Sequence, residues 1–402
     1  MSLAGIRVID FCWVGAGAFV TRILSDMGAE VIKVESRAHP DNLRLSGPHT
    51  PGAAHLEGSG YFATRNTGKK SIALNMQDPE AREIAAQLID SAALVTNNFR
   101  PGIMERWGLD YASIRHRNPG VVFMSMPMQG KSGPHRDFVG FGSTIAAMTG
   151  IVEMAGMPGR PPVGTGTHYP DHIPNPGHAL VAVLAALLHR QRTGEGQEIE
   201  LAQIESTINL LGAGVIESAT ASNRSGPQGN ARQGSVPRGV YPGAGEENWI
   251  AIEVTNSAQW EALVGVLGLP GAFADPELEE LAGREAKSIA IDAAIGAATK
   301  SQDVEQLAER LRAAGVPAAR VSHANDVFND PFLATRRYWQ ELPHQEMKTL
   351  LTNAPPFKRV GIERTLGRTA PLLGEHTIDV VRDLLGMPEA EARRLMDERV
   401  FY

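Results

Sequence analysis

The stretch that decides the fold begins with Ile6-Arg-Val-Ile-Asp-Phe11, continues through the turn Val14-Gly-Ala-Gly-Ala18, and ends with Ala29-Glu-Val-Ile-Lys-Val-Glu35. The first and last segments are short apolar runs, which are typical of buried strands. Residues 19–27 between them have the pattern of a helix, and Gly28 closes it. A strand, a helix and a second strand in this order predict two parallel strands with the helix packed across them.

The same alternation recurs along the chain. Strands are expected at residues 71–75, 92–96, 120–126 and 198–202, and they alternate with stretches of helical pattern. One such helix starts at Asp78-Pro79, where aspartate caps the helix and proline occupies its first position. We therefore predict an α/β fold whose large domain, residues 1–220, is a doubly wound parallel sheet.

A smaller α+β domain is expected over residues 221–329, after a polar, glycine-rich connector at 222–230. Its strands are predicted at 239–241, 249–254 and 317–321, and its main helices at 257–267, 288–300 and 303–314. Residues 330–402 contain short helices and proline-rich links without an apolar core of their own. We expect this C-terminal segment to pack back on the large domain.

Composition narrows the functional class. The 402 residues carry a net charge of −7, which does not favour nucleic acid or an anionic membrane as a partner. The single cysteine, Cys12, excludes an intrachain disulfide and fits a reducing compartment. The N-terminus lacks the pattern of a signal peptide, and the longest apolar run, 179–188, is too short for a membrane span. These features predict a cytoplasmic protein.

The stretch most suggestive of chemistry is Val163-Gly-Thr-Gly-Thr-His-Tyr-Pro-Asp-His-Ile-Pro-Asn-Pro-Gly177. It surrounds one carboxylate, Asp171, with prolines and glycines that restrict the backbone. The helix that follows, residues 178–188, is apolar nearly all round, so we expect it to be buried and to anchor this loop. The alternative is that Asp171 is only a turn or cap residue, although Asn175 before Pro176 is the better cap.

Cations on loops after predicted strands point to an anionic ligand with well-separated phosphates. They lie in the segments 65–70 and 97–102 and at Arg106, Lys131 and Arg136. A dinucleotide site is a weak alternative, because Gly15-x-Gly17 follows a strand but Val20 replaces the third glycine of that motif. The spacing of histidines and the single cysteine predict no metal site.

Taken together, six blocks in order resemble family III CoA-transferases, the class of formyl-CoA and carnitine CoA-transferases. The blocks are residues 5–11, 26–35, 66–74, 98–102, 185–197 and 373–377. The resemblance implies that Asp171 is the catalytic nucleophile and that two chains form an interlocked dimer. It also implies that a CoA thioester binds across the large domain as a substrate, without a tightly bound cofactor or a metal.

The resemblance further implies which residues contact CoA. Expected at the adenine or pantetheine side are Val14, Gly15 and Ala16; at the nucleotide, Asn98, Phe99, Arg100 and Arg106; and at the phosphates, Lys69, Lys70 and Arg136. After the second strand, Ser36 followed by Arg37 stands where the family usually has an acidic or basic residue, and Arg37 is a candidate contact for the adenine or a phosphate. His168, His172 and the connector from Arg224 to Arg238 are candidate contacts for a second carboxylate of the acceptor acid.

The mechanism implied is covalent. Asp171 attacks the donor thioester to form a mixed anhydride, the CoA thiolate converts the anhydride to an aspartyl-CoA thioester, and the acceptor acid reverses these steps. The sequence context resembles members that use succinyl-CoA with an aromatic or dicarboxylic acceptor such as benzylsuccinate. Oxyanions in the site could be stabilised by backbone N–H groups of the glycine-rich turns.

Departures from the family pattern leave two alternatives open. The chain has Gly15 and Ser143 where some members have glutamine and glutamate, and it lacks a tetraglycine lid, which residues 225–234 could replace. One alternative is an α-methylacyl-CoA racemase, but the histidine of its Gly-His-Asp run is absent from Val139-Gly-Phe-Gly-Ser143. The other is one subunit of a heteromeric CoA-transferase, paired with a paralogous chain.

Overall fold

The computed structural model describes residues 2–220, 226–358, 360–361 and 366–402. These residues divide into two compact units. Unit 1 contains residues 1–152, 164–222 and 332–402, and unit 2 contains residues 153–163 and 223–331. Residues 153–163, which we assigned to the large domain from the sequence, thus group with the smaller unit.

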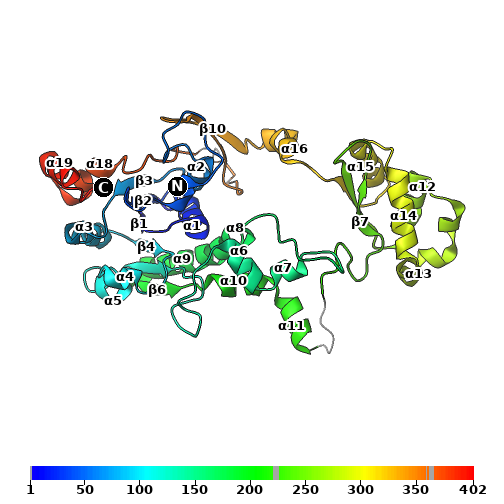
Figure 1. Cartoon of the computed structure of the whole chain (residues 1–402), viewed down its shortest axis with the longest axis horizontal. Coiled ribbons are helices and arrows are strands. Elements are labelled where there is room, and N and C mark those ends of the chain that lie inside the picture. Colours follow the sequence, from blue (N-terminus) through cyan, green and yellow to red (C-terminus); the bar gives the residue numbers. More distant parts are fainter. Residues whose placement is uncertain (1, 221–225, 359, 362–365) are drawn as a thin grey trace. The chain divides into compact units, whose positions relative to one another are not determined.

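Unit 1 is organised around a six-stranded sheet in which every neighbouring pair is parallel (Figure 1). The strand order is β3-β2-β1-β4-β5-β6. The strands are β1 (Arg7–Asp10), β2 (Glu30–Glu35), β3 (Lys70–Ala73), β4 (Leu94–Asn97), β5 (Val122–Ser125) and β6 (Gln197–Glu200). The large parallel sheet expected from the sequence is therefore confirmed, and its order reverses between β1 and β4.

Successive side chains of each central strand alternate between two apolar cores, because strand residues point to opposite faces. Val8 and Val31 pack on the face covered by α1 (Gly15–Asp26) and α9 (Pro174–Thr193). Ile9 and Ile32 pack on the opposite face. That face is covered by α3 (Pro79–Asp90), α18 (Thr377–Leu385) and α19 (Glu389–Asp397).

The remaining helices of unit 1 are short and lie in the connections. They are η1 (Asn42–Leu45), α2 (Gly60–Arg65), α4 (Ile103–Arg106), α5 (Tyr111–Ile114), α6 (Gly142–Met148), α8 (Tyr169–His172), α10 (Gln203–Leu210), α11 (Gly212–Thr220) and α17 (Pro331–Thr335), and α7 (Ile151–Met154) crosses into unit 2. Asp171 thus lies in a helical turn, α8, rather than in an extended loop. Helices α10 and α11 follow each other along the chain, with Leu211 between them.

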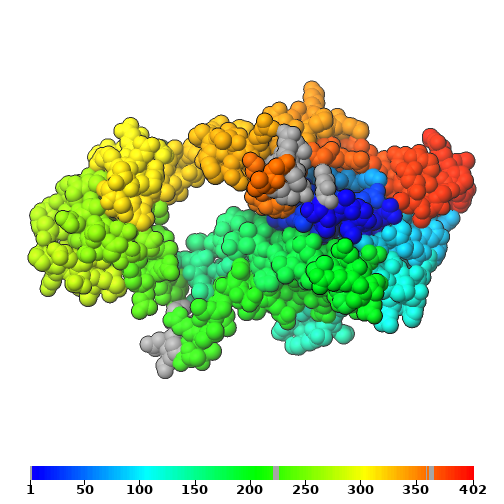
Figure 2. Space-filling view, turned by 180° about the vertical axis from the view of Figure 1, so that it is seen from behind, coloured from blue at the N-terminus to red at the C-terminus, as the bar shows by residue number. Residues whose placement is uncertain are grey.

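The C-terminal segment packs on the N-terminal part of unit 1, as its lack of a separate core predicted. Figure 2 shows its orange and red residues against the blue and light-blue surface of the N-terminal residues. The hairpin of β10 (Trp339–His344) and β11 (Lys348–Asn353) contacts α2, and α18 contacts β3. Arg22 of α1 donates hydrogen bonds to the side chain and the carbonyl of Asn353.

Helix α9 is not buried all round, contrary to expectation. Val181 and Leu188 are 71% and 46% exposed, whereas Ala179 and Val183 are buried against the sheet. The helix therefore has two apolar faces, and in the single chain one of them is open to solvent.

Unit 2 contains the three-stranded antiparallel sheet β7-β8-β9, from β7 (Arg238–Pro242), β8 (Trp249–Glu253) and β9 (Ala318–Arg320). An apolar core of its own lies between this sheet and the helices. The helices are α12 (Ser257–Leu267), η2 (Gly271–Ala274), η3 (Pro276–Glu279), α13 (Leu281–Ala286), α14 (Ser288–Thr299), α15 (Val304–Ala313) and α16 (Ala324–Phe328). None of the helices in the described part of the chain is both long and apolar enough to span a bilayer.

Candidate active site

A cavity of about 270 Å³ lies in unit 1 beyond the carboxyl ends of β1 and β4, where the strand order reverses. In doubly wound sheets this is the position at which ligands bind. Its walls come from the segments after β1 (13–16), after β4 (98–101) and before α6 (136–141), together with Asn42, Met128, Asp171 and Gln203. The cavity therefore joins the suspected nucleophile to the loops that we expected to meet CoA.

Asp171 is placed between two glycine backbones. A Cβ at Gly15 would lie 2.8 Å from Oδ2 of Asp171, and a Cβ at Gly142 would lie 2.6 Å from the same atom. The backbone N–H of Gly142 donates a hydrogen bond to the carboxylate. Glycine at both positions is thus what allows the carboxyl group to be enclosed by backbone while still reaching the cavity.

The electrostatics of Asp171 are those of a reactive carboxyl group rather than a structural one. Asp171 is only 6% exposed, and burial raises its pKa from 3.8 to about 6, although His168 and the Gly142 N–H oppose the rise. No Lys or Arg side chain forms an ion pair with it among the described residues. A poorly solvated carboxylate without a counter-ion is a stronger nucleophile than one in water or in a salt bridge.

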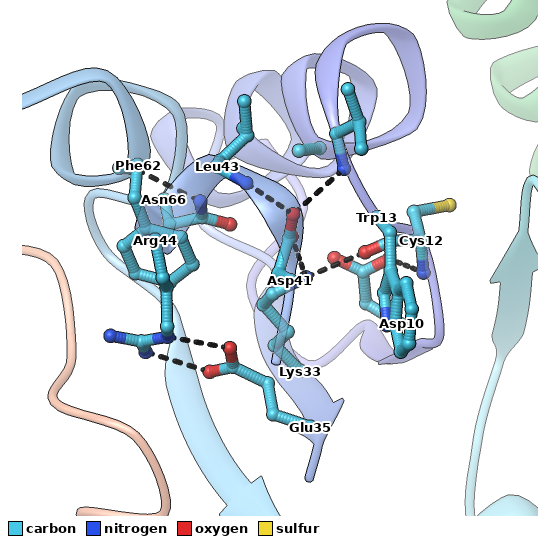
Figure 3. Close-up of polar contacts among 12 residues, drawn as sticks. Asp10, Cys12, Trp13, Lys33, Glu35, Asp41, Leu43, Arg44, Phe62 and Asn66 are labelled. Atoms are coloured by element: carbon cyan, nitrogen blue, oxygen red, sulfur yellow. Dashed lines mark hydrogen bonds and ion pairs between the residues drawn. The ribbon is translucent and has the colours of Figure 1, made fainter. Parts of the chain in front are cut away.

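The turn between β1 and α1 is held by side chains from other elements (Figure 3). Cys12 N–H donates to Asp10, Cys12 C=O accepts from Lys33, and both polar groups of the Trp13 backbone bond to the amide of Asn98. Every backbone donor and acceptor from the Cys12 N–H to the Trp13 carbonyl therefore has a fixed side-chain partner.

The backbone of Val14 is also held by a side chain: its N–H donates a hydrogen bond to Oδ1 of Asp41, at 3.0 Å. Val14 has φ of 59°, a conformation that a β-branched residue rarely adopts and that costs about 1–3 kcal/mol. Asp41 is itself fixed by an ion pair with Lys33, Oδ2 to Nζ 3.0 Å. This buried pair thus helps to hold the strained residue that precedes Gly15.

Lys69 is not available to a phosphate, which corrects our expectation. It is fully buried, and its ammonium group bonds to Asp10, Thr21 and Asn66 at 2.7–3.1 Å. Its role is to compensate the buried carboxylate of Asp10 beneath the turn. Cys12 is buried beside this pair; burial and the Asp10 charge raise the pKa of its thiol, which rules out a ready thiolate.

The cavity gathers many of the other expected residues but not all of them. Its walls include Val14, Gly15, Ala16, Asn98, Phe99, Arg100, Arg136 and Asp171. Arg37, Lys70, Arg106, His168 and His172 do not line it. Lys70 pairs with Glu30, and Arg37 bonds to the carbonyl of Leu373, so both are engaged elsewhere on unit 1.

His172 does not line the cavity, and its ring packs in a cluster with Phe19, Tyr61 and Arg65. Its ring meets those of Phe19 and Tyr61 edge to face, with centroids 6.2 and 6.3 Å apart. Burial, together with the charges of Arg65 and His168, lowers the pKa of His172 to about 4, so its imidazole is neutral. His168, the N-cap residue of α8, is exposed.

Several residues of the site were missed in the sequence. Asp41 and Lys33 have no local signal, because their partners Val14 and Cys12 come from another segment of the chain, whereas Arg65 stood in segment 65–70, which we had examined for an anionic ligand. Trp13 and Gly142 stood within stretches that we had examined, and Gly142 was in the very run that lacks the racemase histidine. From the connector 224–238, Arg224 lies outside the described residues. The described residues contain no His, Cys, Asp and Glu grouping able to hold a metal ion.

Comparisons with known proteins show which proteins this chain resembles. The family model described as CoA-transferase family III matches residues 3–377. The chain is 31% identical over 99% of its length to a probable CoA-transferase of Mycobacterium tuberculosis, of which it spans half. It is 30% identical to the succinyl-CoA–D-citramalate CoA-transferase of Chloroflexus aurantiacus, covering 99% of this chain and 98% of that one. A crystal structure of a CaiB/BaiF family protein from Brucella suis superposes with a TM-score of 0.86 at 28% identity, over 95% of this chain and 98% of that one.

Proposed function

The chain belongs to CoA-transferase family III, and from that premise we propose that it moves CoA from an acyl-CoA to a free carboxylic acid with Asp171 as the nucleophile. The observation that carries this assignment is the carboxyl group of Asp171, buried between Gly15 and Gly142 at the wall of the cavity. A carboxylate without a counter-ion in the described residues is suited to attack a thioester, because little stabilisation must be lost before it reacts.

The reaction conserves the activation of the acyl group. A carboxylate oxygen of Asp171 attacks the thioester carbon, the C–S bond breaks, and CoA leaves as a thiolate. The thiolate then attacks the Cγ of Asp171 in the mixed anhydride, which releases the donor acid and leaves CoA as a thioester on Asp171. The acceptor carboxylate attacks that thioester, and the thiolate returns to the new anhydride to give acyl-CoA and free Asp171.

Backbone groups beside Asp171 fit the needs of these steps. The tetrahedral intermediates place negative charge on an oxygen next to the carboxyl group, where the N–H of Gly142 already donates. The anhydride is hydrolysed readily in water, and 6% exposure of Asp171 limits the access of solvent to it. Gly15 opens α1, whose positive N-terminal end adds favourable potential for a developing oxyanion.

We propose that the CoA part of the substrate lies along the cavity walls. Val14, Ala16 and Phe99 offer apolar contacts, Asn98 bonds to the turn, and Arg100 and Arg136 present exposed guanidinium groups to the phosphates. Arg106, at the end of α4, follows the wall segment 98–101 closely in the chain, and we propose that it binds the same phosphates. Arg37 and Lys70 are left out of this proposal because of the partners described above.

A second chain fits the open face of α9. Val181 and Leu188 are large apolar residues exposed on the helix that follows Asp171, and Ile173 just before it is 52% exposed. An exposed apolar face of this kind marks an interface rather than a solvated surface. We propose an interlocked dimer, with either a second copy or a paralogous chain, and its mass in solution decides between a homomer and a heteromer.

The substrates proposed are succinyl-CoA as donor and a free carboxylic acid as acceptor. The relative from Chloroflexus aurantiacus is named for succinyl-CoA and D-citramalate, a second dicarboxylic acid, and it is similar along its whole length.

Intact-protein mass after mixing with succinyl-CoA tests the nucleophile. The wild type is expected to gain the mass of CoA in a bond that hydroxylamine cleaves, and Asp171→Ala is expected to gain nothing. Asp397→Ala, which removes an exposed carboxylate of α19, is the matched control and should be labelled like the wild type. Absence of label with several acyl-CoAs, together with entry of solvent deuterium at the α-carbon, would refute the transferase and support racemase chemistry.

A further inference from the structure

A cation without a carboxylate counter-ion in the described residues lies near His172, the residue that follows Asp171. Arg65 ends α2, and the centre of its guanidinium group lies 4.7 Å from the ring centroid of Phe19 and 5.6 Å from that of Tyr61. The hydroxyl of Tyr61 lies 3.5 Å from Nε2 of His172. We refer to Phe19, Tyr61, Arg65 and His172 as the arginine cluster.

Two nitrogens of the arginine cluster are buried and lack partners. Neither Nε of Arg65 nor Nδ1 of His172 has a hydrogen-bond partner in the described part of the chain. No carboxylate of the described residues forms an ion pair with Arg65. A largely buried guanidinium group that is stacked on rings and has no carboxylate partner is costly, and burial accordingly lowers the pKa of Arg65.

The neighbouring Arg22 has a structural role, and its partners can be compared with those of Arg65. Arg22 lies 3.5 Å from Asp26, and it also donates to the carbonyls of Thr64 and Asn353. Its charge is therefore compensated by a carboxylate within the fold, although its own Nε, like that of Arg65, has no hydrogen-bond partner among the described residues. Arg65, close enough for its charge to act on Arg22, has the Tyr61 hydroxyl as a side-chain partner but no carboxylate among the described residues, so its charge is better explained by an anionic ligand than by stability.

The arginine cluster lies about one helical turn from the nucleophile. Gly15 contacts Asp171, and Phe19 contacts His172, the next residue of α8. Because Gly15 and Phe19 are four residues apart on α1, they lie on one face of the helix, about 6 Å apart along its axis. Tyr61 connects the two places, since both Arg65 and Asp171 act on the pKa of its hydroxyl.

We propose that Arg65, with the Tyr61 hydroxyl and the His172 imidazole, is a subsite for the distal carboxylate of a short dicarboxylic acid whose other carboxyl group reacts at Asp171. This inference rests on the proposed function and names its substrate class. A guanidinium group can donate two parallel hydrogen bonds to a carboxylate, and both a phenol and a neutral imidazole can add a donor. The rings of Phe19 and Tyr61 hold the guanidinium plane in place.

Matched donors test the subsite. Succinyl-CoA and butyryl-CoA have acyl chains of the same carbon length and differ in the distal carboxylate. The rate at which each labels Asp171 is measured for the wild type, Arg65→Met, Arg65→Lys and Tyr61→Phe. Arg115→Met is the control, because Arg115 is an exposed arginine over the ring of Tyr111 and does not line the cavity.

The wild type is expected to react faster with succinyl-CoA, and Arg65→Met should lower that preference by about 30- to 100-fold through slower reaction of succinyl-CoA alone. Arg65→Lys should retain part of the preference, Tyr61→Phe should lower it by a few fold, and Arg115→Met should leave it unchanged. An unchanged preference in Arg65→Met would overturn the subsite. So would equal loss with both donors, which indicates a structural role for Arg65.

Failure of the proposed transferase function can be distinguished from failure of the subsite. If neither donor labels the wild type, the proposed function is refuted, and the subsite is then tested by calorimetric binding of both thioesters. Tighter binding of succinyl-CoA that Arg65→Met abolishes would support the subsite without any reaction. Equal binding of the two thioesters by the wild type would overturn it.

Discussion

The carboxyl group of Asp171 lies so close to the backbone of Gly15 that a side chain there would overlap it: a Cβ would lie 2.7 Å from the Cβ of Asp171 and 2.8 Å from its Cγ. Real contacts of a Cβ are essentially never shorter than 3.0 Å. The first residue of α1 and the nucleophile on α8 therefore occupy positions that depend on each other.

Gly15→Ala is expected to lower kcat of CoA transfer by about 100-fold or more, because the added methyl group must push the carboxyl group from its position. Gly15 is in a helix with φ outside the left-handed region, so alanine itself suits the backbone. Steady-state kinetics and thermal unfolding of the variant provide the measurement.

Gly265→Ala is the control, since Gly265 lies within α12 and a methyl group added there would meet no atom within 4 Å. It should leave the rate unchanged and raise stability slightly, by about 0.5–1 kcal/mol. Comparable activity of Gly15→Ala and Gly265→Ala would contradict the tight fit around Asp171.

The pH dependence of labelling follows from the pKa of Asp171, which burial raises to about 6. Only the carboxylate can attack a thioester, so the reactive fraction is nearly complete above pH 7 and falls roughly tenfold for each pH unit below 6. The rate of CoA labelling should therefore be measured from pH 4.5 to 8. A rate that stays constant down to pH 4.5 would show that Asp171 keeps an ordinary pKa.

His168→Gln extends this test, because the charge of His168 lowers the pKa of Asp171 and its removal should move the midpoint to higher pH. The exposed His116 offers a control substitution, His116→Gln, which should not move it.

Burial of the ionised carboxylate of Asp171 is expected to lower the free energy of unfolding. A rise of the folded-state pKa from 3.8 to about 6 means that the fold favours the protonated carboxyl group. The cost is fully present above pH 6, where the carboxylate is ionised, and it disappears as the pH falls toward 3.8. Asp171→Asn should therefore be more stable than the wild type at pH 8, by roughly 3 kcal/mol at most, and the gain should shrink near pH 4. Urea unfolding at both pH values measures this difference, and equal stability at pH 8 would contradict it.

The sheet could be predicted from the sequence because each central strand is a short apolar run with a helix or turn on either side. Val8 and Ile9 show the reason: both faces of the sheet are buried, so neither position is polar. The hairpin β10–β11 was missed because Gln340, Glu341 and Pro343 interrupt any apolar alternation. The open face of α9 was also missed. An apolar helix face predicts burial, but it does not indicate whether the same chain or a second chain covers it.

The site could be predicted only in part. Asp171 and the loops after β1 and β4 were found from their motifs, whereas Lys69 was misjudged because a lysine on a glycine-containing loop has the same local pattern whether it is solvated or buried. Its partner Asp10 is 59 residues away in the chain. Asp41 likewise acquires its significance from a long-range contact, its hydrogen bond with Val14 across 27 residues, that no local pattern encodes.

The ion pair of Lys33 and Asp41 supports the last prediction, which concerns the turn before Gly15. Burial alone would lower the pKa of Lys33, yet attraction to Asp41, Glu35 and Asp10 raises it, so the ammonium group is firmly charged. Asp41→Asn leaves that buried charge less compensated, and a loss of about 3 kcal/mol in unfolding free energy is expected.

The double variant Lys33→Met/Asp41→Asn removes both charges and should be less destabilised than the sum of the single variants, by more than about 1 kcal/mol. Its kcat should nevertheless stay below that of the wild type, because the carbonyl of Cys12 loses the hydrogen bond from Lys33 and the strained backbone at Val14 is held less firmly. KM for the donor should change less than kcat, since the turn sets the position of Gly15 against the nucleophile. If the losses in stability of the single variants add up to that of the double variant, Lys33 and Asp41 do not act as a unit. If the folded double variant keeps the kcat of the wild type, the ion pair does not contribute to catalysis.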